Sequence, residues 1–261
     1  MATYNVTTFA DFLEKAATSG NTIVCPEGAV WDLAELDPEN TIRTITINST
    51  VTGNGTEIRS HRGDVAIASS VVITALHWIN SLFDSTNERN CFLYCTSSSG
   101  SAEIKESRVS VQATGGRDFK YNIKLTRCAV TFLSPNTWLL FSSGSELTSR
   151  YNRIHITAPN ATRCNSDAWG LADSQLIIDA PVLTEINNRN RRCTIRGDLA
   201  ACTKKTGTSS SLGSDFCVIN GDDAPNFPAS GSDALNIKRV TDLQMRDADY
   251  LASIGFVIGS E

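Results

Sequence analysis

Residues 124–133, KLTRCAVTFL, contain the pattern that decides the fold. Cys128, Val130 and Phe132 share one face of an extended segment, and the residues between them point to the other, as in a β-strand with one buried face. A small or polar residue comes first, and apolar residues follow two and four places later. One such strand is compatible with many folds, so its recurrence matters.

The pattern recurs five more times, although the last two copies match less well because glycine stands at their third position. Its first positions are separated by 21, 24, 22, 19 and 24 residues. A period near 22 residues in short strands indicates a solenoid. The copies are Ser107, Val109 and Val111; Cys128, Val130 and Phe132; Asn152, Ile154 and Ile156; Ser174, Leu176 and Ile178; Cys193, Ile195 and Gly197; and Cys217, Ile219 and Gly221.

Two all-β architectures fit a chain of short strands. A sandwich would show turns every 8–12 residues or so, whereas a parallel β-helix contributes one coil per repeat. The wider period favours the β-helix, in which equivalent positions stack about 4.8 Å apart. The first positions of the copies would then form one inward column, and the second positions would form the next. The second positions are Val109, Val130, Ile154, Leu176, Ile195 and Ile219.

The eight cysteines are expected to be reduced, and most of them buried. The even count invites a disulfide framework, but the chain is long for a disulfide-stapled domain and contains no CxxC pair. Cys91 and Cys95 would share one strand face at about 13 Å, too far for a bridge. Cys128 fits as a small buried residue beside a corner.

Bulk composition restricts the class. The 261 residues are 41% hydrophobic and 20% charged with a net charge of −5, which indicates a folded chain without the basic stripe of a nucleic-acid-binding protein. The start, MATYNVTTFADFLEK, lacks the features of a signal peptide, and no apolar run is long enough to span a membrane. The sequence therefore predicts no membrane partner and synthesis in the cytoplasm.

Both ends of the chain differ from the repeats. Residues 7–20 predict a helix capped by Thr8 and ended by Gly20. Thr241 and Gln244 form a capping-box pattern before a second helix. The predicted division is residues 1–240 as the β-helix with its N-terminal cap, and residues 241–261 as a C-terminal cap or association segment, since the open ends of a solenoid core need covers.

The segments TIVCPEGAVWDL (22–33) and ITINSTVTGNGTEI (45–58) resemble the start of right-handed β-helix proteins of the pectate-lyase-like superfamily. A narrower resemblance, in ATYNVTTFADFLEKA, GNGTEI and DADYLASIGFVIG, is to β-helical virion proteins of tailed phages and prophages of gut bacteria. This resemblance implies a non-enzymatic structural protein located in the virion. Such a protein would be a fibre, spike or capsid decoration, with host attachment as one role. It would form a homotrimer and would contact other virion proteins.

The alternative function is a carbohydrate-active β-helix, either a glycan-binding module or a polysaccharide depolymerase that contacts a host-surface glycan. Asp222 and Asp223, followed by Lys238 and Arg239, superficially resemble the catalytic elements of polygalacturonase-like enzymes. The expected His-Gly element is missing, and neighbouring strand residues point to opposite faces. These two aspartates are weak candidates, and the sequence predicts no catalytic residue beyond them.

A lyase would instead need basic residues beside carboxylates that hold Ca²⁺. Arg108, Arg153 and Arg196 are expected at outward positions with His155 beside Arg153, but no matching carboxylate cluster follows from the sequence. His61, His77 and His155 lack metal-ligand spacing. His77 is expected to be half-buried, and SHRGD (60–64) is expected to form a turn. The sequence predicts no metal and no cofactor.

Overall fold

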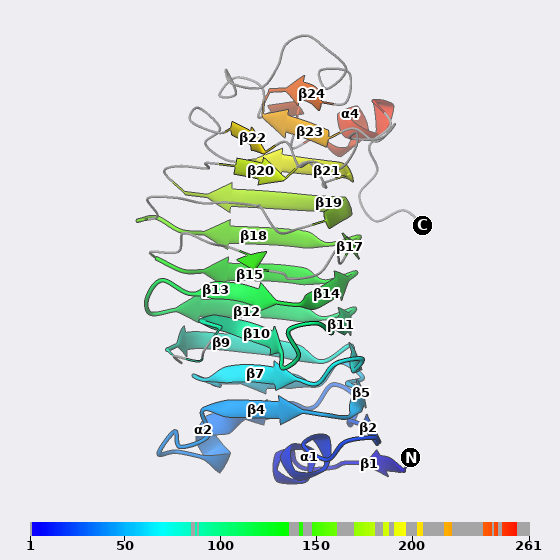
Figure 1. Cartoon of the computed structure of the whole chain (residues 1–261), viewed down its shortest axis with the longest axis vertical. Helices are drawn as coiled ribbons and strands as arrows, with labels where there is room; N and C mark the ends of the chain where they lie inside the picture. The colour runs from blue at the N-terminus through cyan, green and yellow to red at the C-terminus, as the bar shows by residue number, and fades with distance from the viewer. Residues whose placement is uncertain are drawn as a thin grey trace.

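The chain forms a parallel β-solenoid of about five turns, with about 24 residues per turn. The predicted parallel β-helix is confirmed, with a coil slightly longer than the predicted 22 residues. Figure 1 shows the coils stacked along the longest axis of the molecule. The computed structural model describes residues 2–84, 87, 89–135, 141–142, 148–160, 170–180, 185–187, 191–196, 203–205, 217–220, 237–241, 243–244 and 247–254.

The coils build three stacks of parallel strands. The first stack contains β1 (Thr3–Asn5), β2 (Thr22–Val24), β5 (Thr50–Thr52), β8 (Val72–Thr74), β11 (Ala102–Lys105), β14 (Ile123–Thr126), β17 (Thr148–Arg150) and the start of β19 (Gly170–Asp179). The second contains β3 (Val30–Asp32), β6 (Glu57–Arg59), β9 (His77–Phe83), β12 (Arg108–Ala113), β15 (Ala129–Leu133), β18 (Arg153–Thr157), the rest of β19, β21 (Arg191–Arg196), β23 (Cys217–Asn220) and β24 (Ile237–Val240). The third contains β4 (Thr44–Ile47), β7 (Asp64–Ile67), β10 (Cys91–Cys95), β13 (Asp118–Tyr121) and β16 (Phe141–Ser142), and β20 (Glu185–Asn187) pairs with β22 (Thr203–Lys205).

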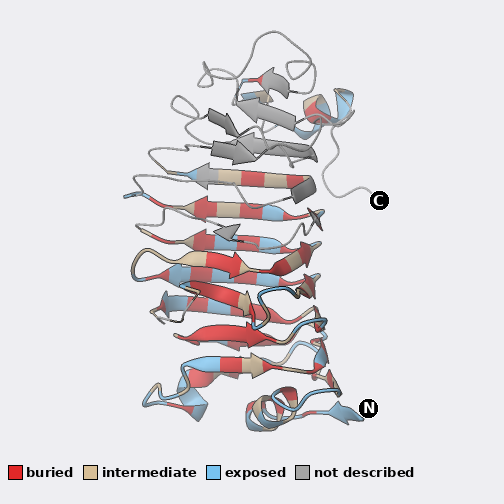
Figure 2. Cartoon of the chain, viewed as in Figure 1, coloured by how far each residue is buried: buried red, intermediate tan, exposed pale blue. Residues whose placement is uncertain are grey.

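The strand register places the predicted second positions in one column. Val109 pairs with Val130, Val130 with Ile154, and the column continues through Leu176 and Ile195 to Ile219. The first four of these side chains are buried, and buried and exposed residues alternate along β12 and β15 (Figure 2). This apolar column is the centre of the solenoid core.

The first positions form a polar ladder beside the corner of each coil. Asn152 Oδ1 accepts a hydrogen bond of 2.9 Å from the Cys128 backbone N–H, and Ser174 Oγ accepts one of 3.0 Å from the Asn152 N–H. Asn152 Nδ2 also donates to the Leu125 carbonyl. The side chains of Asn152 and Ser174 therefore satisfy buried backbone groups of the neighbouring coil, which a corner requires because the strand ladder is interrupted there.

Helix α1 (Phe9–Ala16) covers the first coil. Thr8 accepts a hydrogen bond from the Asp11 N–H, as predicted for the N-cap, but the helix ends at Ala16 and Gly20 lies in the following turn with φ +79°. Phe12 is fully buried, and its ring centroid lies 5.3 Å from that of Trp31 on β3. Aromatic side chains of α1 thus seal the N-terminal end of the core.

Two further helices flank the strands. α2 (Leu33–Leu36) begins after its N-cap Asp32, whose side chain accepts a hydrogen bond from the Ala34 N–H, and the sequence analysis predicts no helix there. At the other end, the capping box forms as predicted, with Thr241 N–H donating to Gln244 Oε1 and Gln244 N–H donating to Thr241 Oγ1. The helix α4 (Ala248–Ser253) has its own cap, Asp247, so the helical turn that follows Thr241 does not simply continue into α4.

Thiol reactivity provides a first test of the core. The side chains of Cys25, Cys91, Cys95 and Cys128 are free and buried. Burial raises the pKa of Cys25 to about 12 and that of Cys128 to about 11, so both stay protonated and unreactive at neutral pH. We expect these four thiols to resist a thiol reagent in the native protein. All eight cysteines should react after unfolding without reductant, and disulfides in the intact protein would contradict the expectation.

Candidate functional site

A shallow groove of about 300 Å³ crosses the outer face of the second strand stack. We call it the rung groove. The residues that line it come from five consecutive rungs, so equivalent positions repeat at the strand spacing of about 4.8 Å. They are Ile79, Arg108, Val109, Ser110, Ala129, Val130, Thr131, Arg153, Ile154, His155, Gln175 and Ile177.

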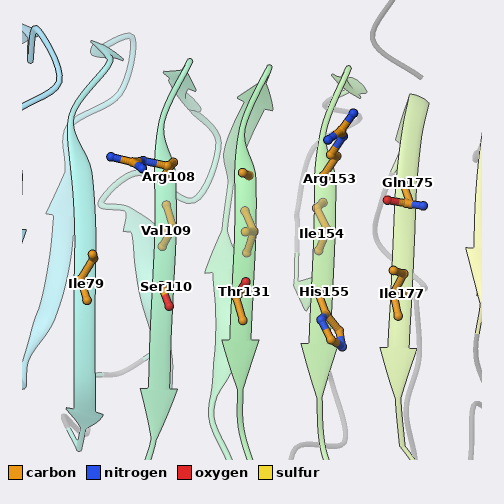
Figure 3. Close-up of a pocket in the computed structure, with 12 residues that line it drawn as sticks. Ile79, Arg108, Val109, Ser110, Thr131, Arg153, Ile154, His155, Gln175 and Ile177 are labelled. Carbon is orange, nitrogen blue, oxygen red and sulfur yellow. The ribbon is translucent and has the colours of Figure 1, made fainter. Parts of the chain in front are cut away.

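The outward side chains of the groove form two rows (Figure 3). The register fixes both rows, because each residue pairs with the equivalent residue of the next coil. One row contains mainly long polar side chains and the other hydroxyl, imidazole and aliphatic groups. The rows are Arg108, Ala129, Arg153 and Gln175, and Ile79, Ser110, Thr131, His155 and Ile177.

Arg108 and Arg153 give the groove its charge. Both are exposed, and Ala129 lies between them in the row, so the two arginines stand two rungs apart, about 9.6 Å along the stack. Within the described part of the chain, neither guanidinium forms an ion pair. Guanidinium groups bind carboxylate, sulfate and phosphate through paired hydrogen bonds, so the row can contact an anionic ligand at two points.

His155 of the second row pairs with Asp179, a carboxylate outside the row. His155 Nε2 lies 2.5 Å from Asp179 Oδ2, and both side chains are exposed, at 41% and 47%. The carboxylate orients the imidazole ring and leaves Nδ1 as the remaining hydrogen-bonding atom for a ligand. Sequence reasoning missed Asp179, which lies on the next coil, two residues beyond Ile177, the register partner of His155.

The lining side chains favour binding over hydrolysis by paired carboxylates. None of the twelve described lining residues is an aspartate or glutamate, and the nearby Asp179 is engaged by His155. Glycoside hydrolysis by the usual route needs two carboxyl groups at roughly 5–9.5 Å across the scissile bond. The groove offers cationic, hydroxyl, amide and aliphatic groups, which can hold a ligand in place.

The predicted catalytic candidates are not brought to this groove by any described contact. Asp222 and Asp223 lie outside the described residues. Lys238 pairs with Val218 at a position equivalent to the row of Arg153, whereas Arg239 pairs with Ile219 and so shares the register of the core column. Arg196 pairs with Ile177 and belongs to the row of His155, so it does not extend the row of Arg108 and Arg153.

Two histidines are more buried than predicted. His77, expected to be half-buried, is 9% exposed, and its Nδ1 accepts a hydrogen bond of 3.0 Å from the Arg108 backbone N–H. His61 is 1% exposed and Asp64 is equally buried, so SHRGD is not a plain exposed turn. Among the described residues, no group of three or more His, Cys, Asp or Glu is arranged to hold a metal ion.

The buried His61 should make stability depend on pH. Burial, and secondarily the charge of Arg43, lower the pKa of His61 to about 4, whereas an unfolded histidine titrates near 6.5. The folded chain therefore keeps His61 neutral. The contribution of this neutral side chain to the free energy of unfolding is fully present above about pH 6.5 and is lost as the pH falls towards 4. We expect a loss of roughly 3 kcal/mol over this interval.

Urea unfolding at several pH values checks this expectation. His61→Leu should reduce the slope of unfolding free energy between pH 6.5 and 4, whereas His155→Gln on the exposed face serves as the control. An unchanged slope in His61→Leu would show that other groups cause the acid sensitivity.

Searches for related proteins complete the description of the site. No helix within the described ranges is long and apolar enough to cross a membrane. Comparisons with models of known protein families, with curated proteins and with solved structures found no match to this chain.

Proposed function

We propose that the chain is a non-enzymatic structural protein of a bacteriophage or prophage virion, as a fibre, spike or capsid decoration, with a role in host attachment. The observation that supports this proposal is the in-register column from Val109 to Ile219. Hydrogen bonds of a parallel solenoid run along its long axis, and each coil contacts only its neighbours, which gives a straight, stiff element. The resemblance of both chain ends to phage β-helical proteins supports the same proposal.

Mass spectrometry of virions purified from the bacterial strain that encodes the chain tests this function. Peptides of the chain should be present in virions at a level comparable to that of other structural proteins. Expression in the cell together with absence from purified virions would contradict the proposal.

The proposed assembly is a homotrimer that depends on residues 241–261. Leu243 is 81% exposed, whereas Leu251 of α4 is buried, so this segment has apolar surface both against its own chain and towards solvent. We propose that Leu243 contacts another chain of the trimer at this end of the solenoid. Deletion of residues 241–261 should give insoluble protein or a smaller species in light scattering. A soluble, folded truncation of unchanged subunit number would contradict this role.

The rung groove supports a second candidate function, binding of an acidic glycan. The observation that favours it is the pair Arg108 and Arg153, exposed at two-rung spacing without an ion-pair partner among the described residues. A chain of uronic acid or sulfated sugars repeats its negative charges along its length, as the groove repeats its positive ones. Such binding is electrostatic and should weaken as salt is added.

Titration calorimetry with polygalacturonate, and with neutral dextran as comparator, tests the second candidate. Polygalacturonate should bind and dextran should not. Arg153→Gln should weaken binding about tenfold through loss of a charge-assisted hydrogen bond, whereas Arg150→Gln, an exposed arginine outside the groove, should not. Equal affinity of both variants would rule out the groove, and release of new reducing ends would identify a depolymerase instead of a binding module.

A further inference from the structure

The first strand of the solenoid has an open edge. Among the described strands, β1 pairs with β2 alone, and it lies at the N-terminal end of the first stack (Figure 1). All three residues of β1 are exposed. Helix α1 packs against β2 and β4 and closes the end of the core, but it leaves β1 uncovered on the side away from β2.

The parallel register shows which backbone groups point to this open edge. The Ala2 carbonyl accepts a hydrogen bond of 2.9 Å from β2, and the Val6 N–H donates one of 3.0 Å to β2. Alternate residues of a parallel strand direct their N–H and C=O groups to the same side. Ala2, Tyr4 and Val6 therefore face β2, and the backbone groups of Thr3 and Asn5 face away from it. Neither Thr3 nor Asn5 has a hydrogen-bond partner within the described ranges.

An open strand edge is a template for a further strand. Many proteins protect such an edge with a lysine, a proline or a bulge, but β1 has the sequence Thr-Tyr-Asn and pairs with β2 in unbroken register. Its short length is its only protection. In strand addition, backbone hydrogen bonds hold an extended segment of a partner. Three residues give weak pairing by themselves, so side-chain interactions must add to the affinity.

Charge identifies the kind of partner. Residues 1–40 form the first coil with α1 and α2, and they contain seven aspartates and glutamates, one lysine and no arginine. Their formal charge of −6 exceeds the −5 of the whole chain, so residues 41–261 carry +1. The one cation, Lys15, is already engaged, since its Nζ lies 2.6 Å from Glu14 Oε1 and 5.6 Å from the centroid of the Tyr4 ring. This end of the solenoid therefore attracts basic groups and repels an identical end.

Side chains on both sides of the edge can contribute to such a contact. Glu14 lies on α1, directly after β1 in the chain, and its side chain is 72% exposed. Glu27 is exposed in the turn that follows β2. Tyr4 is 37% exposed and pairs with Ile23 of β2, so its ring offers an apolar surface to one side chain of an added strand.

We propose that the N-terminal end of the solenoid binds an extended segment of a partner protein that is rich in lysine or arginine and pairs with β1 as an additional strand. The backbone groups of Thr3 and Asn5 hold the backbone of this segment, and the acidic residues of the first coil attract its basic side chains. The site lies at the opposite end of the solenoid from α4 (Figure 1). It is distinct from the rung groove and does not depend on the proposed virion function.

Hydrogen exchange of the full chain tests the proposal, with a synthetic peptide of alternating valine and lysine as the probe. The Thr3 and Asn5 amides should exchange rapidly in the free chain and at least tenfold more slowly with the peptide bound. The same peptide with glutamate in place of lysine should bind at least tenfold more weakly. The proposal is wrong if the lysine peptide does not bind, if it binds without protecting these two amides, or if the glutamate peptide binds equally well.

Two substitutions of one residue isolate the strand edge. Asn5→Pro removes the outward N–H but leaves the hydrogen bonds between β1 and β2, and proline is tolerated where an edge N–H faces solvent. Asn5→Ala keeps the N–H. The proline variant should bind the lysine peptide about tenfold more weakly, the effect of one lost hydrogen bond, whereas the alanine variant should bind it unchanged. Equal affinity of the two variants would overturn the proposal.

A second pair of variants isolates the charge and does not alter β1. The double variant Glu14→Gln with Glu27→Gln should weaken binding of the lysine peptide roughly fivefold. Glu106→Gln, which removes an exposed carboxylate after β11, should leave binding unchanged. Equal affinity of the double variant and Glu106→Gln would contradict the proposed role of the first coil.

Light scattering without peptide distinguishes a second copy of the chain as the occupant of the edge. The wild-type chain and Asn5→Pro should have the same subunit number, because two acidic ends repel each other. A smaller subunit number in Asn5→Pro would show that a second copy pairs with β1, and this result would overturn the proposal.

Discussion

Val130→Asp should destabilise the protein by about 4 kcal/mol or more, enough to unfold most domains of this size. Val130 is 3% exposed and lies in the core column between Val109 and Ile154. An aspartate at this position would have to bury a carboxylate between two aliphatic side chains without a hydrogen-bond donor. Urea unfolding followed by circular dichroism, or loss of soluble protein on expression, measures the effect.

Thr131→Asp is the matched control. Thr131 neighbours Val130 in the chain, but its side chain points outward into the rung groove, where it is exposed. The same new charge should therefore change stability by no more than about 0.5 kcal/mol. Equal destabilisation by both substitutions would contradict the assignment of the inward and outward faces.

Gly63→Ala should cost roughly 4 kcal/mol, or prevent folding. A Cβ atom at Gly63 would lie 1.7 Å from the backbone oxygen of Arg43, the residue before β4 in the preceding coil. This oxygen accepts the hydrogen bond of the Asp64 N–H at 2.9 Å, so the two coils cannot separate without losing the start of the β4–β7 pairing. The cost is steric, since backbone atoms cannot rotate away as a flexible side chain can.

Gly115→Ala provides the comparison. A Cβ atom at Gly115 would meet only the end of the Arg117 side chain, at 3.9 Å. This substitution should therefore be nearly neutral, and the thermal midpoints of the two variants should differ by many degrees. A Gly63→Ala variant as stable as Gly115→Ala would show that the coils do not approach each other so closely.

The core column could be predicted from the sequence because apolar residues recur at it in successive coils. The same column extends towards the N-terminus through Trp31, Ile58 and Trp78. These three rungs were not recognised, since the step from Trp78 to Val109 is longer than the others and the aromatic residues replace aliphatic ones. A strict period fails wherever a loop enlarges one coil.

The polar ladder was recognised as a column but not explained. A sequence shows that Asn152 and Ser174 are small or polar, but their hydrogen bonds to backbone groups of the next coil depend on the register. The residues before them, Tyr151 and Asp173, have φ of +59° and +52°. Neither is glycine, the usual residue for this conformation, so the corner gave no clear sequence signal.

The functional site was predicted least well. Arg108 and Arg153 were correctly placed outward, but the pairing of His155 with Asp179 joins residues on different coils. Such a pair depends on how the coils stack, and a single sequence does not state this.

Disulfide cross-linking across neighbouring rungs tests the stacking of the coils most directly. Ser110 and Thr131 are paired residues of β12 and β15, so their Cα atoms should lie about 4.8 Å apart, within the range of a disulfide. The double variant Ser110→Cys with Thr131→Cys should form a bridge under mild oxidation, detectable by mass spectrometry. The pair Ser110→Cys with Leu133→Cys is displaced by two residues to about 8 Å and should remain reduced. Preferential bridging of the displaced pair, or no bridge in either, would contradict the register on which the solenoid and the rung groove depend.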